Sequence, residues 1–585
     1  MPKKQSTDIP TKFLSPYLCL GDDNFHDLCG GRENSDGIQI PLRGPGEMGT
    51  DHQSVLISGY AGTGKTTFAA QLTAQTLLRN NERARQDQIK PHVWPQDAQA
   101  IYYAVDQSES EIMQIFRKYQ WFGQEIEARC FPVPNVARGN YLAADFGKLP
   151  EDTRESIRKA SILIRKLPFD LDWKELQRVI ENDVRNSASL KLKVKLITID
   201  SLNLLGRTED GKKDLDLFQE IISDVARAAE KTEYTSYSTI VIMEIDGHLA
   251  EGAMPVLKEE YRPDVVFLLN RERDTLSRRT IEIRKARGQH HLIGNHEFRI
   301  ESQAPRRGPK LLGINVYPSI AARSRMIPET DARSDQPNSP MEFGVTAIDD
   351  VLKDKAKSWQ LIEGSTTLLW GDPGTGKTDV CVRFLAAQWR KNPQSRVLFL
   401  TNKVDPRIIR HDLIDAAKGD EEIRDAFGKA SDIEAKVDDR LEIIEASDPF
   451  RSHARIYTDV VNAFFDASKK NMPIRRAVIF GLGLIEETPE IRDHQWRFVS
   501  VLVRFLRFYS ISTLLVDWPV EGYQGTSHSR PRASKLCGNE IHTALEEGRR
   551  ILTIERSDYS PVGEKFFWDR DAKTWSRLPP NRDIS

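Results

Sequence analysis

The run Val55-Leu56-Ile57-Ser58-Gly59-Tyr60-Ala61-Gly62-Thr63-Gly64-Lys65-Thr66 recurs far along the chain as Thr367-Leu368-Leu369-Trp370-Gly371-Asp372-Pro373-Gly374-Thr375-Gly376-Lys377-Thr378. Each copy begins with a short apolar run, passes through a glycine-rich loop and continues into an amphipathic stretch, over Phe68–Leu78 and Val380–Trp389. This order predicts a strand, a phosphate-binding loop and a helix. The distance between the copies is too long for a solenoid repeat and predicts a duplicated domain.

Apolar, β-branched runs alternate with helical patterns after each loop, and such runs are typical of buried parallel strands. The runs are Ala100–Val105, Val194–Ile199, Ser238–Ile245, Arg396–Thr401, Ala477–Phe480 and Ser512–Val516. The helical patterns are Trp173–Val184, Leu215–Ala229 and Trp496–Tyr509. The alternation predicts an α/β fold with two tandem P-loop domains, each a mostly parallel central sheet flanked by helices.

The stretch from Gln303 to Met341 has the composition of a connection between domains, because it contains Arg-Arg-Gly-Pro and a polar run bounded by prolines. We therefore expect four segments along the chain. They are an N-terminal tail over 1–15, a first domain over 16–302, a linker over 303–341 and a second domain over 342–585.

The composition is that of a globular protein with room for two large cores, since 39% of the 585 residues are hydrophobic and 29% are charged. Lys and Arg number 84 against 86 Asp and Glu, so no basic excess favours nucleic acid, although a local basic patch stays open. The five scattered cysteines form no CxxC pair. No signal-peptide core or long apolar stretch is present, so we expect a cytoplasmic location and no membrane segment.

The first loop has the residue types that bind a nucleoside triphosphate. Glycines let backbone N–H groups face the phosphates, the lysine neutralises the β- and γ-phosphates, and the next threonine places its hydroxyl on Mg²⁺. We therefore expect ATP and Mg²⁺ as ligands. The predicted nucleotide-binding residues are Gly59, Gly62, Thr63, Gly64, Lys65, Thr66 and Thr67, and Thr66 is also a predicted metal ligand.

Two carboxylates follow predicted strands near this loop. Asp200 ends an apolar run and is the predicted metal-holding acid, with a helix cap or turn residue as the alternative. Asp106 follows another run, where a hydrolytic site needs a group that deprotonates water, and Gln107 beside it could position that water. Asp106, Gln107 and Lys65 are thus the predicted catalytic residues. A capping role for Asp106 or Ser108 is the alternative.

Several stretches together, by their order and spacing, resemble the KaiC branch of the RecA-like ATPases, the circadian-clock ATPase and its relatives. The resemblance covers nearly the whole chain. The stretches are the two P-loops, Ile199-Asp200-Ser201, the run from Arg278 to His291, Gly313-Ile314-Asn315-Val316-Tyr317-Pro318, and the run from Gly344 to Leu352.

The resemblance implies two RecA-like domains that assemble as a hexameric ring, with ATP between neighbouring subunits. It also implies that Lys285, Arg287 and His291 reach the nucleotide of the next subunit. Cations aimed at a γ-phosphate stabilise charge that develops in the transition state, which agrees with that role. Without the resemblance, this run is simply a basic strand end, and that alternative stays open.

The chain departs from the family's pattern at the catalytic base. The family usually carries paired glutamates where this chain has Asp106 and Gln107, so the acid is one methylene shorter and its neighbour is uncharged. We therefore expect slow hydrolysis at the first loop.

The second copy departs further. Asn402 and Lys403 are expected at the positions of Asp106 and Gln107, Gly481 is expected at the position of Asp200, and 553–558 replaces the basic run. The second loop keeps its lysine, so we expect phosphate binding without efficient turnover. Its predicted nucleotide-binding residues are Gly371, Gly374, Thr375, Gly376, Lys377, Thr378 and Asp379, and Thr378 is also a predicted metal ligand.

Autokinase activity in the second domain is therefore not expected. Ser527, Ser529 and Ser534 lie in a region comparable to that of the clock protein, but hydroxyls near arginines are more often part of an ordinary solvated loop.

The sequence leaves three functional hypotheses. The leading one is a slow ATPase that acts as a homo-oligomeric, nucleotide-dependent switch read by another protein. A DNA-dependent motor or recombinase is an alternative, which the near-neutral charge does not favour. A non-hydrolysing, ATP-bound scaffold is the third, and the Asp106 and Gln107 substitutions are its support.

Overall fold

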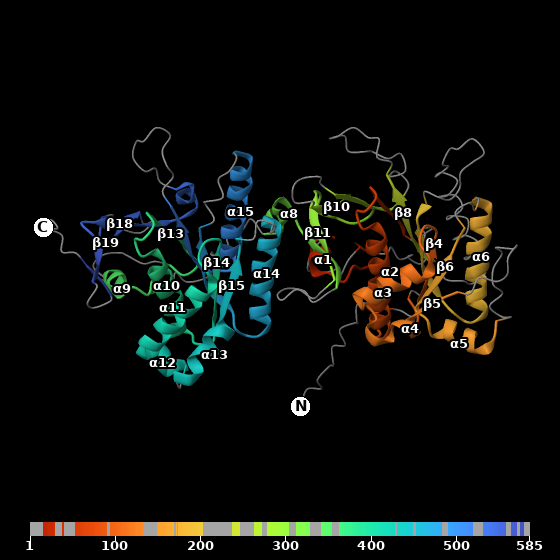
Figure 1. Cartoon of the computed structure of the whole chain (residues 1–585), viewed down its shortest axis with the longest axis horizontal. Coiled ribbons are helices and arrows are strands. Elements are labelled where there is room, and N and C mark those ends of the chain that lie inside the picture. The colour runs from red at the N-terminus through yellow and green to blue at the C-terminus, as the bar shows by residue number, and fades with distance from the viewer. Residues whose placement is uncertain are drawn as a thin grey trace, which may run out of the picture. The chain divides into compact units, whose positions relative to one another are not determined.

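The computed structural model describes residues 16–29, 38–39, 53–89, 94–133, 149–168, 171, 173–202, 237–245, 263–271, 278–302, 312–327, 341–353, 362–427, 430–447, 452–481, 489–518, 531–556, 563–569 and 574–577. The chain divides into two compact units, Met1–Ala322 and Arg323–Ser585, both drawn in Figure 1. Each unit is built around its own large sheet.

In the first unit, strands alternate with helices. Its strands are β1 (Tyr17–Leu18), β2 (Ile38–Gln39), β3 (Ser54–Gly59), β4 (Gln99–Ala104), β5 (Cys130–Pro132), β6 (Ile162–Lys166), β7 (Val194–Asp200), β8 (Ser238–Glu244), β9 (Val265–Arg271), β10 (Arg279–Ala286), β11 (His296–Glu301) and β12 (Gly313–Tyr317). Its helices are α1 (Asp23–Leu28), α2 (Lys65–Arg85), α3 (Glu109–Tyr119), α4 (Ile126–Arg129), α5 (Glu151–Lys159) and α6 (Trp173–Ser189), and α8 (Ile320–Met326) crosses the boundary to the second unit.

The sheet of the first unit has ten strands in the order β12-β11-β10-β9-β3-β8-β7-β4-β6-β5. From β9 to β5 all neighbours run parallel. From β9 to β12 they are antiparallel. Strand β3, which leads into the first P-loop, lies between β8 and β9, so the loop is at the carboxyl edge of the parallel strands, where ligands bind in open α/β sheets.

Helices α2 and α6 cover opposite faces of this sheet, and Figure 1 shows them on either side of β4 and β6. Successive strand residues point to opposite faces, so one strand can contribute side chains to both faces of the sheet. On one face, Thr198 of β7 is hydrogen-bonded to Thr73 of α2 at 2.8 Å. On the other, Tyr103 of β4 donates to Asp183 of α6 at 3.0 Å, within a core of buried aliphatic side chains.

Gln71 in the P-loop helix α2 ties two other segments of the first unit to that helix. Its Nε2 donates to Leu20 O at 2.9 Å and to Ile314 O at 3.0 Å, and its Oε1 accepts from the Ile314 N–H at 2.6 Å. Ile314 belongs to β12, which lies inside the segment 303–341 expected to be a linker. The last strand of the first sheet is therefore part of that segment, and the two units divide after Ala322.

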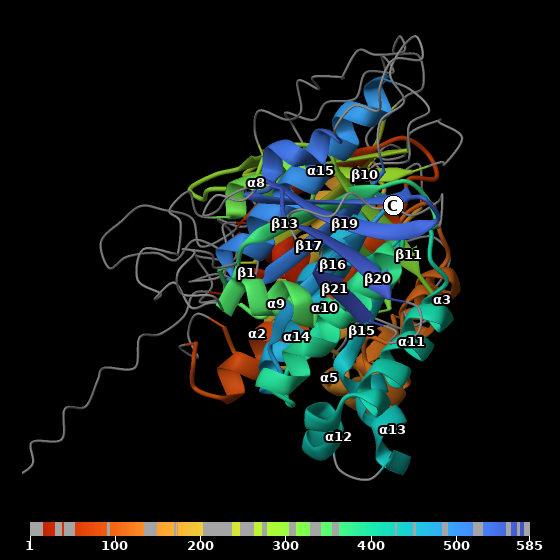
Figure 2. The same ribbon diagram turned by 90° about the vertical axis from the view of Figure 1, so that its left-hand side faces the viewer.

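The second unit repeats this plan. Its strands are β13 (Thr366–Gly371), β14 (Arg396–Thr401), β15 (Leu441–Glu445), β16 (Ile474–Phe480), β17 (Ser512–Asp517), β18 (Asn539–Glu546), β19 (Arg549–Arg556), β20 (Lys565–Asp569) and β21 (Thr574–Arg577). Its helices are α9 (Thr346–Lys353), α10 (Lys377–Lys391), α11 (Pro406–Gly419), α12 (Glu421–Phe427), α13 (Ala430–Arg440), α14 (His453–Lys469) and α15 (Pro489–Phe508). Helices α11, α12 and α13 pack against one another near α10, as Figure 2 shows.

The sheet of the second unit has nine strands in the order β15-β14-β16-β17-β13-β18-β19-β20-β21. Strands β15 to β18 are parallel. Strands β18 to β21 are antiparallel. Apart from β5 at its edge, the first sheet has the same order, so each strand of the second sheet has a counterpart in the first. This pairing confirms the predicted fold class, two tandem α/β units with mostly parallel sheets.

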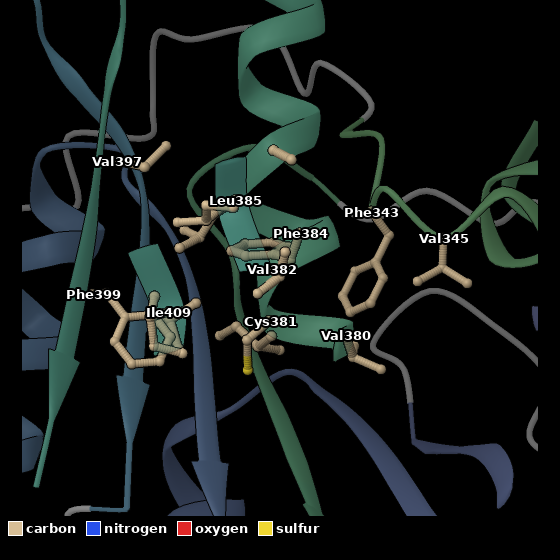
Figure 3. Close-up of a cluster of buried hydrophobic side chains, with 14 of the residues drawn as sticks. Phe343, Val345, Val380, Cys381, Val382, Phe384, Leu385, Val397, Phe399 and Ile409 are labelled. Carbon is tan, nitrogen blue, oxygen red and sulfur yellow. The ribbon is translucent and has the colours of Figure 1, made fainter. Parts of the chain in front are cut away.

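The core of the second unit gathers around α10, whose apolar residues pack against β14, β16 and the segment before α9. Figure 3 shows Phe343 beside Phe384, with ring centroids 5.5 Å apart. Beneath them the guanidinium of Arg476 is buried, where it donates to Glu342 O at 2.6 Å and to Phe384 O at 2.5 Å. These bonds hold the entry segment of the second unit against its P-loop helix.

The strands expected from the apolar runs are present as β4, β7, β8, β14, β16 and β17. The patterns Trp173–Val184 and Trp496–Tyr509 correspond to α6 and α15, which extend further than predicted, and the pattern Leu215–Ala229 lies outside the described residues. All five cysteines are buried free thiols. None of the helices in the described ranges combines the length and apolar character needed to cross a bilayer.

Candidate nucleotide-binding site

The first P-loop is shaped by its glycines. It links the end of β3 at Gly59 to the start of α2 at Lys65, and it has positive φ at Gly62 (73°) and Gly64 (100°). L-residues rarely adopt this conformation. Gly64 is also crowded, because a Cβ there would lie 2.7 Å from Ile300 Cδ1, whereas a Cβ on Gly62 would meet open space. The loop therefore needs glycine at Gly64 for two reasons.

Lys65 lies folded back over this loop. Its Nζ donates to Tyr60 O at 2.7 Å and is 3.7 Å from a carboxylate oxygen of Glu244, at the end of β8. The same carbonyl accepts from Thr63 Oγ1 at 2.9 Å. Burial lowers the pKa of Lys65, and the charges of Glu244 and Asp200 oppose that shift. An ammonium held this way is placed where incoming phosphates would find it.

Asp200, the predicted metal-holding acid, ends β7 and is buried, with 4% of its surface exposed. It accepts a hydrogen bond from the Tyr102 hydroxyl at 2.8 Å and another from the Thr66 side chain. Burial raises its pKa to about 6, against the lowering effect of those two bonds. Hydroxyl and carboxylate oxygens are ligands that Mg²⁺ prefers, so Thr66 and Asp200 together fit a magnesium ion.

Asp106 and Gln107 lie in the four-residue segment between β4 and α3. Asp106 accepts from Ser201 Oγ at 2.9 Å, and its charge acts on both Asp200 and Lys65. The Gln107 side-chain oxygen is buried without a hydrogen-bond partner. The N-cap of α3 is Ser108, in a capping box with Glu111, so Asp106 does not cap that helix.

Lys285, Arg287 and His291 are placed elsewhere in the first unit. In the sheet, Gly59 of β3 pairs with Leu269 of β9, but Lys285 pairs with Val266 at the other end of β9. The three intervening steps of a strand span about 10 Å. Arg287, further along, is 3.5 Å from Asp264, and burial lowers the pKa of His291. These residues therefore lie towards the edge opposite the P-loop of their own chain.

The second P-loop has nearly the same backbone. Gly374 and Gly376 have φ of 82° and 92°, and Thr375 donates to Asp372 O at 2.8 Å as Thr63 does to Tyr60 O. Lys377 donates to Gly371 O and Asp372 O, each at 2.6 Å. Burial lowers the pKa of Lys377 to about 8. The phosphate cradle is thus present in both units.

Comparison with known proteins agrees with this architecture. No family model matches the chain. The circadian clock oscillator protein KaiC 1 of Synechocystis sp. is 26% identical over 348 residues, which cover 59% of this chain and 53% of that protein. KaiC of Prochlorococcus marinus is 23% identical over 394 residues, 67% of this chain and 62% of the relative, and KaiC of Rippkaea orientalis is 26% identical over 350 residues, with 59% and 53% covered.

The chain is thus similar to KaiC proteins at low sequence identity. The match to the Synechocystis protein spans about half of that protein's length, 53%. This similarity agrees with the two tandem RecA-like α/β units expected from the resemblance.

The strand register corrects the expected correspondence between the two sites by one residue. Ala104 pairs with Asp200, and Thr401 pairs with Phe480, so Phe480, not Gly481, occupies the place of Asp200. The backbone agrees, because Val105 N–H donates to Asp200 O and Asn402 N–H donates to Phe480 O.

The turn after β14 is corrected in the same way. Strand β4 ends at Ala104, and strand β14 ends at Thr401. The N-cap of the helix that follows lies four residues later in each case, at Ser108 for α3 and at Asp405 for α11. Lys403 therefore stands at the place of Asp106, and Val404 at the place of Gln107, instead of Asn402 and Lys403. A cation thus replaces the predicted base of the first site.

A third position differs between the sites. Gly59 pairs with Glu244, and the pairing of Trp370 with Asp517 puts Trp518 next to Gly371 in the same register. The Trp518 ring lies beside Lys377, with Nζ 5.2 Å from the ring centroid. None of the three carboxylates around Lys65, from Asp106, Asp200 and Glu244, has an acidic counterpart in the second unit of this KaiC-like chain.

Other predicted residues of the second unit have structural contacts. Asp379 is 3.0 Å from Arg383 and accepts from the Trp575 indole at 3.3 Å, which gives it a packing role beside α10. Arg556, the register counterpart of Lys285, is 2.9 Å from the fully buried Glu540. Ser534 also donates to Glu540, at 2.5 Å. Thr378 follows Lys377 as Thr66 follows Lys65, and Ser527 and Ser529 lie outside the described residues.

Sequence reasoning missed three residues of the first site. Glu244 pairs with Lys65, Tyr102 donates to Asp200, and Ser201 donates to Asp106. Glu244 had the same signal as Asp200, an acid at the end of an apolar run. Tyr102 had no such signal, because a tyrosine inside a strand reads as core.

Proposed function

We propose that the chain is a Mg²⁺-dependent ATPase with turnover at the first P-loop, and that the second P-loop binds nucleotide without hydrolysing it. The observation that supports this most strongly is the convergence of Lys65, Thr66, Asp200 and Asp106 on one loop, set against the loss of every corresponding carboxylate in the second unit. On this proposal the protein works in the cytoplasm as an oligomeric switch whose nucleotide state is read by a partner protein.

Each residue of the first site has a separate role in the proposed reaction. Lys65 would hold the β- and γ-phosphates, while Thr66 and Asp200 would hold the metal, which supplies charge neutralisation when bound. Asp106 would accept a proton from the attacking water, and Ser201 orients its carboxylate through a 2.9 Å hydrogen bond. Gln107 has an unpaired buried oxygen that could accept a hydrogen bond from the same water. A single short acid favours slow turnover.

Lys285, Arg287 and His291 would act on a neighbouring subunit. Their place towards the opposite edge of the sheet prevents them from serving the P-loop of their own chain, so a second copy is needed to bring cations to each nucleotide. The KaiC resemblance adds the expectation of a hexameric ring. Supplying charge in trans would couple hydrolysis to assembly.

The site assignment is tested by steady-state phosphate release from the full chain. Lys65→Ala should lower the rate by about 100-fold or more, because a buried, preorganised cation is removed. Lys377→Ala should lose nucleotide from the second loop while hydrolysis persists. Turnover that survives Lys65→Ala would refute the assignment.

The trans arrangement has a separate test. Lys65→Ala and the double variant Lys285→Ala/Arg287→Ala should each be inactive alone, but an equal mixture should regain about a quarter of the wild-type rate if subunits exchange freely. A mixture of Lys65→Ala with the triple variant Lys65→Ala/Lys285→Ala/Arg287→Ala should stay inactive, because neither chain has an intact Lys65. Native mass measurement with ATP and Mg²⁺ would report the subunit number.

A non-hydrolysing scaffold is the second candidate. One carboxylate oxygen of Asp106 already accepts a hydrogen bond from Ser201, and the side chain of Gln107 has no charge. Steady phosphate release over hours by the wild-type chain, absent in Lys65→Ala, would eliminate it.

A further inference from the structure

The acids that stand near the first P-loop are replaced by other residue types at the corresponding places of the second. By strand register, Lys403 stands at the place of Asp106, and Trp518 stands at the place of Glu244. The place of Asp200 is taken by Phe480, which packs edge-on against Trp518 with ring centroids 5.5 Å apart. A magnesium ion would therefore find no carboxylate at the places of Asp106, Asp200 and Glu244. The strand-end acid near Lys377 is Asp517 of β17, which stands at the place of Met243 in the first unit.

Lys377 and Lys403 lie over one aromatic ring. Their Nζ atoms are 5.2 Å and 4.6 Å from the centroid of Trp518. Neither ammonium is within 4.0 Å of a carboxylate among the described residues, although Asp372 and Asp517 act on Lys377 at longer range. The charge of Lys403 in turn disfavours the charge on Lys377. A bound anion would offset this repulsion between like charges.

Arg550 adds a third cation at the start of α10. A Cβ on Gly376 would lie 3.2 Å from Arg550 Cδ and 3.5 Å from its Nη1, so the guanidinium covers the helix N-terminus. In the first unit the corresponding contact, at Gly64, is the apolar Ile300. A helix N-terminus carries partial positive charge and disfavours a cation beside it. This placement makes sense if a bound anion shares the site.

We infer that the second P-loop binds the phosphates of a nucleoside di- or triphosphate free of any divalent cation, with Lys403 and Arg550 providing the charge that Mg²⁺ provides at the first loop. This inference rests on the proposed function, in that the second unit binds nucleotide. It goes further, because it states the form in which the nucleotide binds and explains why hydrolysis does not follow: no metal is bound, and the places of Asp106 and Asp200 hold no acid to activate water.

The test uses the full chain with Lys65→Ala, which silences the first loop, and radiolabelled ADP and ATP in equilibrium dialysis. We expect one nucleotide per chain, with a dissociation constant that changes less than about twofold between 5 mM Mg²⁺ and excess EDTA. The reciprocal variant, Lys377→Ala, should bind one nucleotide that EDTA releases.

The role of Lys403 is tested in the same background. Lys403→Ala should weaken binding in EDTA by about tenfold, the effect of one charge-assisted phosphate contact. Lys403→Asp restores an acid at the place of Asp106, and it should weaken binding in EDTA further. Lys418→Ala is the matched control, because Lys418 is also exposed but pairs with Glu434 at 3.0 Å. It should leave binding unchanged.

The outcomes separate the inference from the proposed function. If EDTA releases nucleotide from Lys65→Ala, metal-free binding is wrong while nucleotide binding by the second unit stands. If Lys65→Ala binds no nucleotide in either condition, both the inference and that part of the proposed function fail, but turnover at the first loop is untouched. Equal effects of Lys403→Ala and Lys418→Ala would overturn the role given to Lys403.

Discussion

The two P-loops of this chain share a backbone and differ in almost every side chain around it. In both loops the last two glycines have positive φ, a threonine is bonded back to the loop and a lysine is folded over it. Three acids, Glu244, Asp200 and Asp106, act on the first lysine, whereas an aromatic ring and the cation of Lys403 lie beside the second, with Asp372 and Asp517 acting on it at longer range. Phosphate binding depends on backbone N–H groups, whereas metal binding and water activation depend on side chains at strand ends. Those side chains can therefore change while the cradle is kept.

The largest contrast is expected at the paired positions Asp200 and Phe480. Asp200→Asn should reduce phosphate release by about 100-fold, because the metal loses its carboxylate. The free energy of unfolding of this variant should not fall. Because burial raises the pKa of Asp200 to about 6, the ionised carboxylate of the wild type lowers the stability of the folded state above that pH. Phosphate release and urea unfolding of the same variant provide the check. Strong destabilisation without loss of turnover would break the comparison.

Phe480→Ala should show the reverse pattern. Phe480 is 4% exposed and stacks on Phe399 at 5.9 Å, so truncation should cost about 3 kcal/mol of stability. Hydrolysis at the first loop should change little, provided that the second unit remains folded at the assay temperature. Denaturant unfolding followed by tryptophan fluorescence would measure the loss. An activity loss as large as that of Asp200→Asn would indicate a hydrolytic role for the second unit.

A smaller effect is expected from pH. The pKa of Asp200 is raised to about 6, so its carboxylate is mostly ionised at pH 7 and mostly protonated at pH 5 in the metal-free protein. Mg²⁺ binds the ionised form, so metal affinity should fall about tenfold per pH unit below that pKa. Titration of Mg²⁺ into the ADP complex of Lys377→Ala would measure it, with Asp200→Asn as a control that lacks this dependence. A flat profile would contradict the assignment.

The smallest effect is expected at Lys377, the lysine of the second P-loop. Because the pKa of Lys377 is lowered to about 8, its side chain is partly neutral at pH 8 when no nucleotide is bound. A bound phosphate should restore its charge. Nucleotide binding by Lys65→Ala at pH 8 should therefore take up about half a proton. Calorimetry in two buffers with different ionisation enthalpies would detect it, and pH 6.5 should abolish it. Proton release instead of uptake would argue against phosphate contact with Lys377.

The sequence predicted the parts of the fold and site that depend on local pattern. The glycine loops, the strands that follow them and Asp200 at the end of β7 are all visible as residue types in order. Glu244 could have been found by the same reasoning, since it also ends an apolar run. The sequence did not predict the register between the two units to the exact residue. Phe480 and Lys403 take the places expected for Gly481 and Asn402, because an apolar pattern does not fix where a strand pairs with its neighbour.

Other features depend on contacts between distant segments. The place of Lys285 became clear only from the antiparallel pairing of β10 with β9, which turns the basic run away from its own P-loop. The segment 303–341 reads as a linker from its prolines, yet β12 within it pairs with β11 along its full length. All five residues of β12 are buried, so a short apolar strand was hidden within a segment whose overall composition is that of a connection.

The side-chain amide of Gln71 has a mechanical consequence. It bonds to both backbone groups of Ile314, so the helix that begins at Lys65 and the strand that ends at Tyr317 are joined by a short, direct clamp. A displacement of that helix within the first unit would therefore act on β12 through the side chain of one glutamine.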